Sequence, residues 1–488
     1  MVIESLKYKI LQQFGFAPTQ EQGQALDTFV SFLTDRDPQA VMILRGSAGT
    51  GKTSLSGAIV RTLLQIHQKV MLLAPTGRAA KVFSLGSGAP AYTIHRRIYR
   101  EKAFAGVDGQ FSLNDNLYTD TLFMVDEASM IANMGLGGTT FGSGCLLDDL
   151  VKFVYQGHND RLLLIGDKAQ LPPVGEEESP ALSASVMEGY GLKVYECDLN
   201  EVLRQSQSSG ILYNATLIRQ MITHDAVTGL PLIRFKGFAD IVMMPGAELV
   251  ESLGDSYHHV GMDETMVITR SNKRANIYNN GIRNMVLDRE EELSSGDMLM
   301  IVKNNYFWTE KEKKESGEGS AGAVPAFLAN GDRAKVLRVS NYIELYGFRF
   351  ATLLLQLPDY DDYEMQVTGM LDTLQSEAPA LTHEQQEELF RQVEEDYQHF
   401  VPLKADRMKS IRQDAYFNAL QIKYAYAVTC HKAQGGQWAH VYVDQGYMTD
   451  DMLTPDYIHW LYTAFTRATD KLFLVNWPKE QTCEPTDL

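Results

Sequence analysis

The chain has 488 residues, enough for two to four domains, and its hydrophobic (44%) and charged (22%) fractions are those of an ordinary globular protein. No apolar stretch approaches the length of a membrane span, so we expect no membrane partner. The net charge of −18 weighs against a nucleic-acid partner without excluding one, because a binding channel needs only local positive charge.

The first predicted element is an amphipathic helix near the N-terminus. Apolar residues recur there at helical spacing, so that one face carries Leu6, Ile10, Leu11 and Phe14. Charges at Glu4, Lys7 and Lys9 interrupt this segment, and no apolar core of a signal peptide is present.

A hydrophobic strand, a glycine-rich loop and a helix follow in "AVMILRGSAGTGKTSLSGAIVRTLLQ", residues 40–65, where the loop fits the pattern G-x-x-x-x-G-K-[ST]. In this pattern the glycines let backbone N–H groups approach phosphate oxygens, Lys52 reaches the β- and γ-phosphates, and Thr53 holds Mg²⁺. The alternative is a glycine-rich turn that merely opens a helix, but chance matches rarely have a strand before and a helix after. The residues predicted to bind ATP are Gly46, Ser47, Ala48, Gly49, Thr50, Gly51, Lys52 and Thr53.

Two adjacent acids end the next predicted strand, in "TDTLFMVDEASMI" (119–131). Asp126 is predicted to complete the Mg²⁺ site with Thr53, and Glu127 to orient and deprotonate the attacking water. Adjacent residues of an extended strand point to opposite sides, which would allow the two acids different roles. A solvated acidic turn is the alternative. Beside a P-loop, the pair predicts an NTPase.

A third strand, "RLLLIGD", ends at Asp167 and is followed by Gln170 and two prolines. In a parallel sheet its end lies on the same edge as the P-loop and Asp126, which would place Gln170 near the γ-phosphate. An amide can accept a hydrogen bond from the attacking water and donate one to a phosphate oxygen. Pro172 and Pro173 would stiffen this segment, so that a shift at the phosphate is passed on. Taken alone, the segment is better explained as a polar loop after a strand.

Eight motifs occur in one order along the chain: "GSAGTGKT", "LLAPTGRAAKVF", "TIHRRI", "VDEASM", "GDKAQLPPVG", "LNEVLRQ", "VTCHKAQGGQW" and "LYTAFTRATDKLFLV". Together they resemble the motifs of superfamily 1 helicases, of the RecD-like branch that includes the phage Dda enzyme, over residues from about 16 to 476. The resemblance implies an α/β fold with two RecA-like P-loop lobes, a small hairpin (pin) insertion in the first and an SH3-like β-barrel insertion in the second. The implied limits are 1–199 for the first lobe with the pin at about 96–120, 200–292 and 419–488 for the second lobe, and 293–418 for the barrel insertion.

The resemblance also assigns roles in the ATP site. Gln22 matches the adenine-reading glutamine, and Gln170 matches the γ-phosphate sensor that links hydrolysis to movement. Arg204 matches an arginine that contacts the γ-phosphate, and Arg467 matches the arginine finger. Both arginines would come from the second lobe, so that ATP is clamped between lobes. The alternatives are a glutamine on a surface helix for Gln22 and a structural ion pair for Arg467.

Residues matching the family's strand contacts occur in both lobes. They are Pro75, Thr76 and His95 in the first lobe and Asn272, Lys273, Thr429 and His431 in the second. Basic residues gather in the same part of the second lobe, at Arg270, Lys273, Arg274 and Arg283. A structural histidine and a solvated helix face are the alternatives for His95 and for the basic residues.

The pin is predicted from two short strand-like runs around "GVDG" within residues 100–120. Phe104 and Phe111 would stack on the terminal base pair, whereas in an ordinary surface hairpin the same aromatic rings pack inward. Within 293–418, strand-like runs separated by Gly and Asn turns predict the barrel, and "THEQQEELFRQVEEDYQHF" predicts an acidic helix with a solvated face.

The predicted function is ATP-dependent movement along single-stranded DNA, 5′ to 3′, with the pin parting the duplex; the direction rests on the resemblance alone. Open alternatives are a translocase that displaces proteins without strong unwinding, an RNA-directed helicase, and an ATP-gated binding module. The expected partners are single-stranded DNA, single-strand/duplex junctions and replication or repair proteins, and the expected state is a monomer. Four scattered cysteines without a CxxC pair indicate a reducing cytoplasm rather than a disulfide framework or zinc site.

Overall fold

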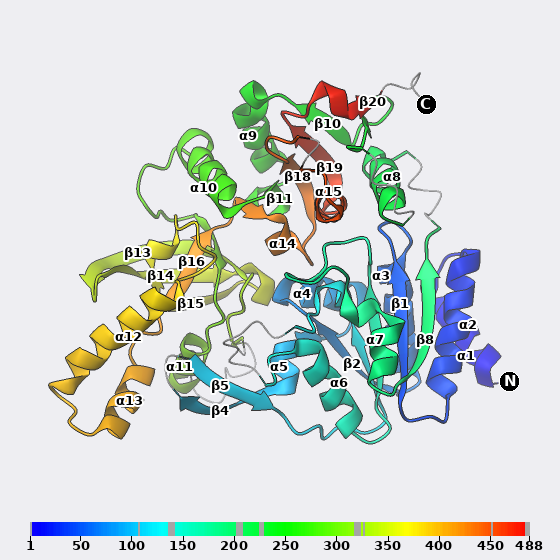
Figure 1. Ribbon diagram of the computed structural model, residues 1–488, viewed down its shortest axis with the longest axis horizontal. Coiled ribbons are helices and arrows are strands. Elements are labelled where there is room, and N and C mark those ends of the chain that lie inside the picture. The colour runs from blue at the N-terminus through cyan, green and yellow to red at the C-terminus, as the bar shows by residue number, and fades with distance from the viewer. Residues whose placement is uncertain are drawn as a thin grey trace. The chain divides into compact units, whose positions relative to one another are not determined.

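The structure is a computed structural model that describes residues 2–105, 108–134, 142–201, 208–223, 229–316, 324–325, 327–449 and 452–483 (Figure 1). The chain divides into two compact units. The first comprises residues 1–102, 110–246 and 433–488, and the second comprises 103–109 and 247–432. Residues of the predicted second lobe therefore occur in both units, and the predicted lobe limits stay a prediction.

The first unit contains a six-stranded sheet in the order β3-β2-β6-β7-β1-β8. All five neighbouring pairs are parallel. The strands are β1 (Ala40–Gly46), β2 (Lys69–Ala74), β3 (Ala91–Thr93), β6 (Thr121–Val125), β7 (Arg161–Gly166) and β8 (Lys193–Leu199). Strands β1, β6 and β7 are buried along their whole length, which explains their continuous apolar sequences.

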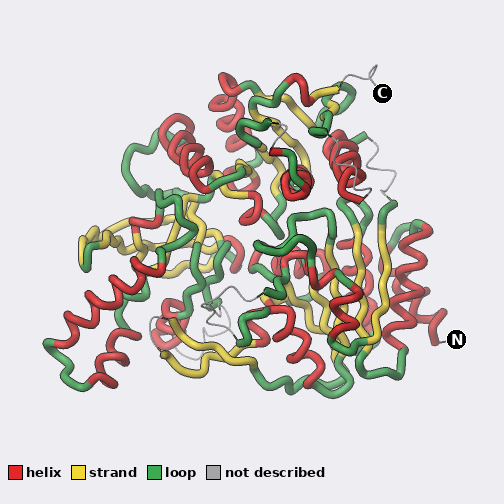
Figure 2. Tube along the Cα trace, in the orientation of Figure 1, coloured by secondary structure: helices red, strands yellow, loops and turns green. Residues whose placement is uncertain are grey.

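Helices cover both faces of this sheet, as Figures 1 and 2 show. Met42 and Leu44 of β1 face the core formed with α1 (Val2–Phe14), α2 (Gln20–Thr34), α3 (Lys52–Gln65) and α4 (Gly77–Ser87). The alternate residues Val41 and Ile43 face the core formed with α5 (Ile94–Ile98) and α6 (Leu146–Gln156), and α7 (Ala184–Gly189) joins that core through Met187. The predicted N-terminal amphipathic helix is confirmed, because Leu6, Ile10 and Phe14 are buried and Leu11 packs beside them.

Later segments of the chain complete the first unit. Strands β10 (Ile241–Met244), β19 (Ala468–Val475) and β18 (Trp438–Asp444) run parallel in that order. Helix α8 (Gly210–Thr223) packs against α15 (Pro455–Phe465), and β9 (Ile233–Arg234) pairs with β20 (Thr482–Cys483). Helix α15 is buried on almost every side, from Tyr457 to Phe465.

The second unit contains a closed barrel of five strands, in agreement with the predicted barrel insertion. Its strands are β12 (Met298–Ile301), β13 (Arg333–Leu345), β14 (Phe348–Leu357), β15 (Tyr363–Met370) and β16 (Leu420–Tyr424). The chain also forms α11 (Phe307–Ser316), and the predicted acidic helix is α12 (His383–Gln398), which packs with α13 (Lys404–Arg412). The mixed α/β fold with parallel sheets and a barrel is thereby confirmed.

Outside the barrel, the second unit contains two parallel strands, β11 (Thr265–Thr269) and β17 (Ala427–Thr429), with α9 (Leu249–His259), α10 (Asn272–Gly281) and α14 (Cys430–Ala433). A π-helical turn (Ile282–Val286) follows α10 and carries Arg283. The guanidinium of Arg283 is buried against the carboxylate of Asp297, 3.0 Å away, which Arg289 also contacts. Arg283 therefore belongs to a buried ion pair rather than to the predicted exposed basic cluster.

The predicted hairpin is present as β4 (Tyr99–Ala105) and β5 (Asp108–Leu113), which form a two-stranded sheet. Phe111 packs against the core around α5 and α6, as in an ordinary surface hairpin. Residues 106–107 and the side chain of Phe104 lie outside what the structure describes, so the predicted role of the pin stays a prediction. None of the helices in the described part of the chain combines the length and apolarity that crossing a membrane requires.

Candidate nucleotide site

Three strands of the first unit end together at one edge of its sheet. Strand β7 lies between β6 and β1, with Val125 opposite Leu164 and Arg45 opposite Gly166. Because all three strands are parallel, the residues that follow them meet at their carboxyl ends. This edge carries the glycine-rich loop after β1, Asp126 and Glu127 after β6, and Asp167 after β7. The structure therefore brings together the three segments as predicted.

The glycine-rich loop turns sharply into α3. Gly49 and Gly51 take left-handed backbone angles, φ +76° and +79°, which glycine adopts without steric cost. At Gly46, a Cβ atom would lie 2.7 Å from Cγ of Lys52, so no larger residue fits while the lysine lies as it does. The ammonium of Lys52 donates to the carbonyl oxygens of Gly46 and Ser47, and Thr53 is exposed in the first helical turn. This is the loop-and-helix geometry that presents backbone N–H groups to phosphate.

Gln22 lies against the loop and is 1% exposed. Its Oε1 accepts from the Thr19 amide at 3.0 Å, which completes the capping box of α2. Its Nε2 donates to the Thr50 carbonyl at 2.9 Å. The amide thus ties α2 to the loop, and its adenine-reading role stays a prediction.

The chain turns at Asp126 and Glu127, directly after β6. The strand ends at Val125, and Glu127 takes a left-handed conformation (φ +53°) while its amide donates to Asp126 Oδ1 at 2.9 Å. The extended backbone expected at these two residues is therefore absent, because the strand ends before them. A left-handed non-glycine residue is uncommon and is found often at functional sites.

The carboxylate of Asp126 suits a divalent cation. Burial, together with the neighbouring Glu127 carboxylate, raises the pKa of Asp126 to about 7, and the Lys52 ammonium offsets this only in part. A hydroxyl from Thr53 and a carboxylate from Asp126 are hard oxygen ligands of the kind Mg²⁺ prefers. Within the described residues no cluster of three or more His, Cys, Asp or Glu side chains forms a metal site. Other ligands would be water and phosphate oxygens, as is usual for Mg²⁺.

Gln170 lies in the loop that follows β7, which we call the glutamine loop (residues 167–171). Its side chain is 6% exposed, and its Oε1 is buried without a hydrogen-bond partner among the described residues. Buried polar atoms are nearly always paired, so an orphaned amide oxygen at this edge fits a group that faces a ligand or its attacking water. Asp167 Oδ1 shapes the loop by accepting from the Ala169 amide at 3.0 Å.

Side chains from later in the chain hold this loop, and sequence reasoning missed them. In α15, His459 Nδ1 lies 2.9 Å from the Ala169 carbonyl, and Thr463 Oγ1 accepts from the Leu171 amide at 2.8 Å. Tyr462 donates to Asp167 Oδ2 at 2.7 Å and accepts from the Ala48 amide at 3.0 Å. Gln434 Nε2 donates to the Leu171 carbonyl at 2.7 Å. Polar residues spaced i, i+3 and i+4 in an otherwise apolar helix were the available signal.

The predicted arginines have different outcomes. Arg467 is 2% exposed, and its guanidinium donates to the carbonyls of Thr463 and Gly436 (both 3.1 Å) and to Thr466 Oγ1 (3.2 Å). Its role as a finger stays a prediction, and Arg204 lies outside the described residues. The guanidinium that does reach the glycine-rich loop is that of Arg219 in α8, which donates to Ser47 Oγ. Sequence reasoning did not single out Arg219.

The predicted strand contacts of the first lobe lie after β2 and β3. Pro75 precedes Thr76, which caps α4 by accepting from the Ala79 amide at 3.2 Å. A Cβ atom at Gly435 would lie 3.1 Å from Thr76 Oγ1, so the segment around Gly435 passes close to this cap. His95 is the second residue of α5, and its ring centroid is 5.6 Å from that of Tyr99. Burial lowers the pKa of His95 to about 4.

The predicted contacts of the second lobe meet within the second unit. Thr269 pairs with Thr429 at the ends of β11 and β17, and α10 begins with Asn272 and Lys273 just after β11. His431 follows β17 in α14 and is exposed. The four predicted residues thus share one edge of a parallel strand pair, although their contact with a strand stays a prediction.

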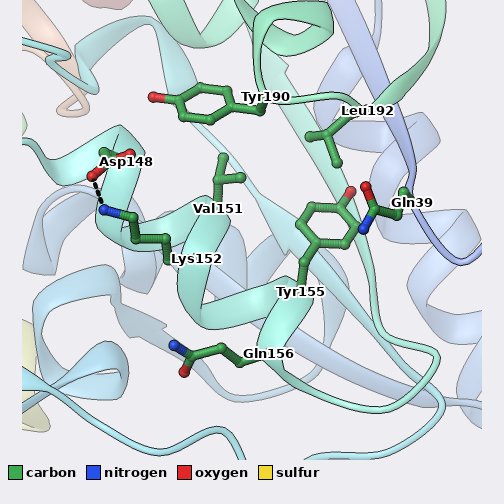
Figure 3. A pocket seen from close by; sticks show the side chains of 8 residues that line it. All are labelled: Gln39, Asp148, Val151, Lys152, Tyr155, Gln156, Tyr190 and Leu192. Carbon is green, nitrogen blue, oxygen red and sulfur yellow. Dashed lines mark hydrogen bonds and ion pairs between the residues drawn. The ribbon is translucent and has the colours of Figure 1, made fainter.

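A separate cavity of about 270 Å³ lies beside α6 (Figure 3). Its wall includes Tyr155, Tyr190 and Gln39, the residue that precedes β1. It therefore lies at the opposite end of β1 from the glycine-rich loop, and its lining contains none of the predicted site residues.

Comparison with known families matches both ends of the motif series. Residues 17–229 match the family described as AAA domain, and residues 424–475 match the UvrD-like helicase C-terminal domain.

Curated relatives include two helicases. The chain is 30% identical over 157 residues to the ATP-dependent RecD2 DNA helicase of Deinococcus radiodurans, covering 32% of this chain and 18% of that protein. It is 25% identical over 267 residues to the ATP-dependent DNA helicase dda of Enterobacteria phage T4, covering 53% and 55%. The chain thus spans less than two thirds of each of these relatives. The crystal structure of a Bacteroides Pif1 helicase with ADP-AlF3 and single-stranded DNA aligns over 96% of this chain and 95% of that chain, at 13% identity and a TM-score of 0.45.

Proposed function

Because the chain belongs to the superfamily 1 helicases of the RecD- and Dda-like branch, we propose that it hydrolyses ATP to move 5′ to 3′ along single-stranded DNA and to part duplex DNA ahead of it. The observation that carries this proposal is the meeting of Lys52, the acid pair and Gln170 at one edge of a parallel sheet. These residues supply the cation, the base and the amide that phosphoryl transfer to water needs.

Each residue has a defined task in this proposal. The loop amides and Lys52 bind the phosphates, and Gln22 reads the adenine. Thr53 and Asp126 hold Mg²⁺, which when bound neutralises charge on the phosphate oxygens. Glu127 takes the proton of the attacking water, and Gln170 hydrogen-bonds that water and the phosphate. Arg204 and Arg467 stabilise the charge that develops on the transferred group.

Strand binding is proposed to use two groups of residues. The first is Pro75, Thr76 and His95, and the second is Asn272, Lys273, Thr429 and His431. Helix N-termini begin at both Thr76 and Ser271, and such termini favour phosphate groups. Local donors of this kind allow a protein of net charge −18 to bind a polyanion.

Forked DNA substrates test the proposal. The full chain, ATP and Mg²⁺ are incubated with duplexes that carry a 5′ tail, a 3′ tail or both, and strand separation is measured. Separation that requires the 5′ tail and ATP supports the proposal, whereas separation that requires only the 3′ tail contradicts the direction. Displacement of streptavidin from a biotinylated single strand without strand separation would indicate the protein-displacing translocase instead. A tail of RNA in place of DNA tests the strand chemistry.

A further inference from the structure

Four polar side chains from the C-terminal segment contact the glutamine loop. Three of them contact its backbone, and the fourth contacts the side chain of Asp167, the first residue of the loop. Three of the four, His459, Tyr462 and Thr463, lie on one face of α15, because residues three and four apart are neighbours on a helix. Their contacts, with that of Gln434, span the loop from Asp167 to Leu171 at 2.7–2.9 Å. A displacement of the glutamine loop would therefore break these hydrogen bonds or move α15 with it.

Tyr462 differs from the other three because it also reaches the glycine-rich loop. Its hydroxyl donates to Asp167 Oδ2 and accepts from the Ala48 amide, so one oxygen joins the segments after β1 and β7. The side chain is 1% exposed. Burial and the Asp167 carboxylate raise the pKa of Tyr462 well above its ordinary value, so the hydroxyl keeps its proton and its donor role.

We propose that Tyr462 is a positioning residue that couples phosphate binding at the glycine-rich loop to the glutamine loop and to α15. The Ala48 amide belongs to the set of backbone donors that cradle phosphates in such loops. A phosphate oxygen and the Tyr462 hydroxyl are therefore competing acceptors for one N–H. Phosphate binding would free the hydroxyl from Ala48 while it stays anchored to Asp167, so that the loop carrying Gln170 and the helix carrying Tyr462 respond to the same event. This inference rests on the proposed function.

Two variants of adjacent residues separate this coupling from simple packing. Tyr462→Phe keeps the buried ring and removes both hydrogen bonds, whereas Thr463→Val removes the bond to Leu171 and leaves the Ala48 amide bonded to Tyr462. Affinity is measured by titration with a fluorescent ATP analogue, and hydrolysis is measured with and without oligo-dT. Thermal unfolding is followed in parallel.

Tyr462→Phe is expected to bind the analogue roughly two- to tenfold more tightly, the range that one net hydrogen bond represents, because the competing acceptor is gone. Its stimulation by oligo-dT is expected to fall about fivefold, in the same range. Thr463→Val is expected to lose stimulation with an affinity within about twofold of wild type, a change smaller than that of one hydrogen bond. A residue that only supports the fold would lower the unfolding temperature and weaken binding, which is the opposite sign.

Equal or weaker analogue binding by folded Tyr462→Phe would overturn the inference. If that variant does not fold, Asp167→Asn weakens the other end of the same link and is expected to tighten analogue binding; failure to do so would also overturn it. The affinity comparison needs neither DNA nor turnover. A wild-type protein without oligo-dT stimulation would therefore contradict the proposed function while leaving the test of the Tyr462–Ala48 competition intact.

Discussion

The glycine-rich loop and the turn that follows α15 each contain a cation predicted to contact phosphate, Lys52 and Arg467, and the two cations have different surroundings. The Lys52 ammonium contacts carbonyls of its own loop, whereas the Arg467 guanidinium is buried with three acceptors around the end of α15. The glycine-rich loop consists of contiguous residues, and its glycines and backbone carbonyls fix the position of Lys52 locally. Side chains on α15 instead take the acceptors that tertiary packing provides, and the group that reaches the loop is the hydroxyl of Tyr462.

The largest expected effect comes from the cation of the glycine-rich loop. Lys52→Ala should lower the rate of ATP hydrolysis by at least about 100-fold, because it removes the ammonium that this loop pattern directs at the β- and γ-phosphates. Lys168→Ala is the matched control, since Lys168 is exposed in the glutamine loop near the same edge. Steady-state hydrolysis of the two variants checks the prediction. Similar losses in both would mean that general positive charge, and not the loop lysine, is what matters.

We expect different contributions to stability from Arg467, which follows α15, and Arg219, which contacts the glycine-rich loop. Arg467→Ala removes the donor to the buried Gly436 carbonyl and one of two side-chain donors to the Thr463 carbonyl, which keeps the Thr466 hydroxyl, so the free energy of unfolding should fall by about 1–3 kcal/mol. Arg219→Ala removes the contact to Ser47 Oγ and a long one, 3.5 Å, to the Asn200 carbonyl at a partly exposed site, and the stability loss should stay below about 1 kcal/mol. Urea denaturation measures both. The rate of ATP hydrolysis decides the finger role: a folded Arg467→Lys variant that hydrolyses ATP at the wild-type rate would exclude it.

Gln170 belongs to the glutamine loop, which α15 contacts and which ends at the same sheet edge as the glycine-rich loop. Its substitution should change ATP hydrolysis less than that of Lys52. Gln170→Ala should retain ATP binding within about threefold and lose oligo-dT stimulation by about tenfold, since it removes an amide whose buried Oε1 accepts no hydrogen bond from the described residues. Analogue titration and stimulated hydrolysis provide the measurement. Normal stepping by this variant, followed on single DNA molecules, would refute the sensor role.

Local sequence patterns were sufficient to predict those parts of the site that consist of contiguous residues. The glycine-rich loop, the acid pair and the glutamine loop each follow a buried strand, and parallel strand order alone brings them to one edge. The barrel and the hairpin were predictable for the same reason, since period-two patterns and turns mark them. The links made by Arg219, Gln434 and Tyr462 could not be predicted, because each joins residues more than 160 positions apart and depends on tertiary packing. The turn at Asp126 and Glu127 could not be predicted either, since nothing in the residue types requires a left-handed glutamate.

The smallest expected effect concerns His95, which lies in the short helix after β3. Burial lowers the pKa of His95 to about 4, below the ordinary histidine value of about 6.5. The unfolded chain therefore binds more protons between these values, so the stability from neutral His95 is complete above pH 6.5 and is lost as pH falls toward 4. His95→Gln should remove about 1 kcal/mol of this pH dependence, a reduced figure because the ring is only partly buried. Denaturation curves at pH 7 and pH 4.5 for both proteins provide the measurement. The same variant tests strand binding. Between pH 8 and 6 His95 stays neutral, so the affinity for oligo-dT should depend on pH in the same way in the wild type and in His95→Gln. A rise in affinity on acidification that only the wild type shows would mean that His95 binds the strand as a cation and that its surroundings are more polar than the packing against Tyr99 implies.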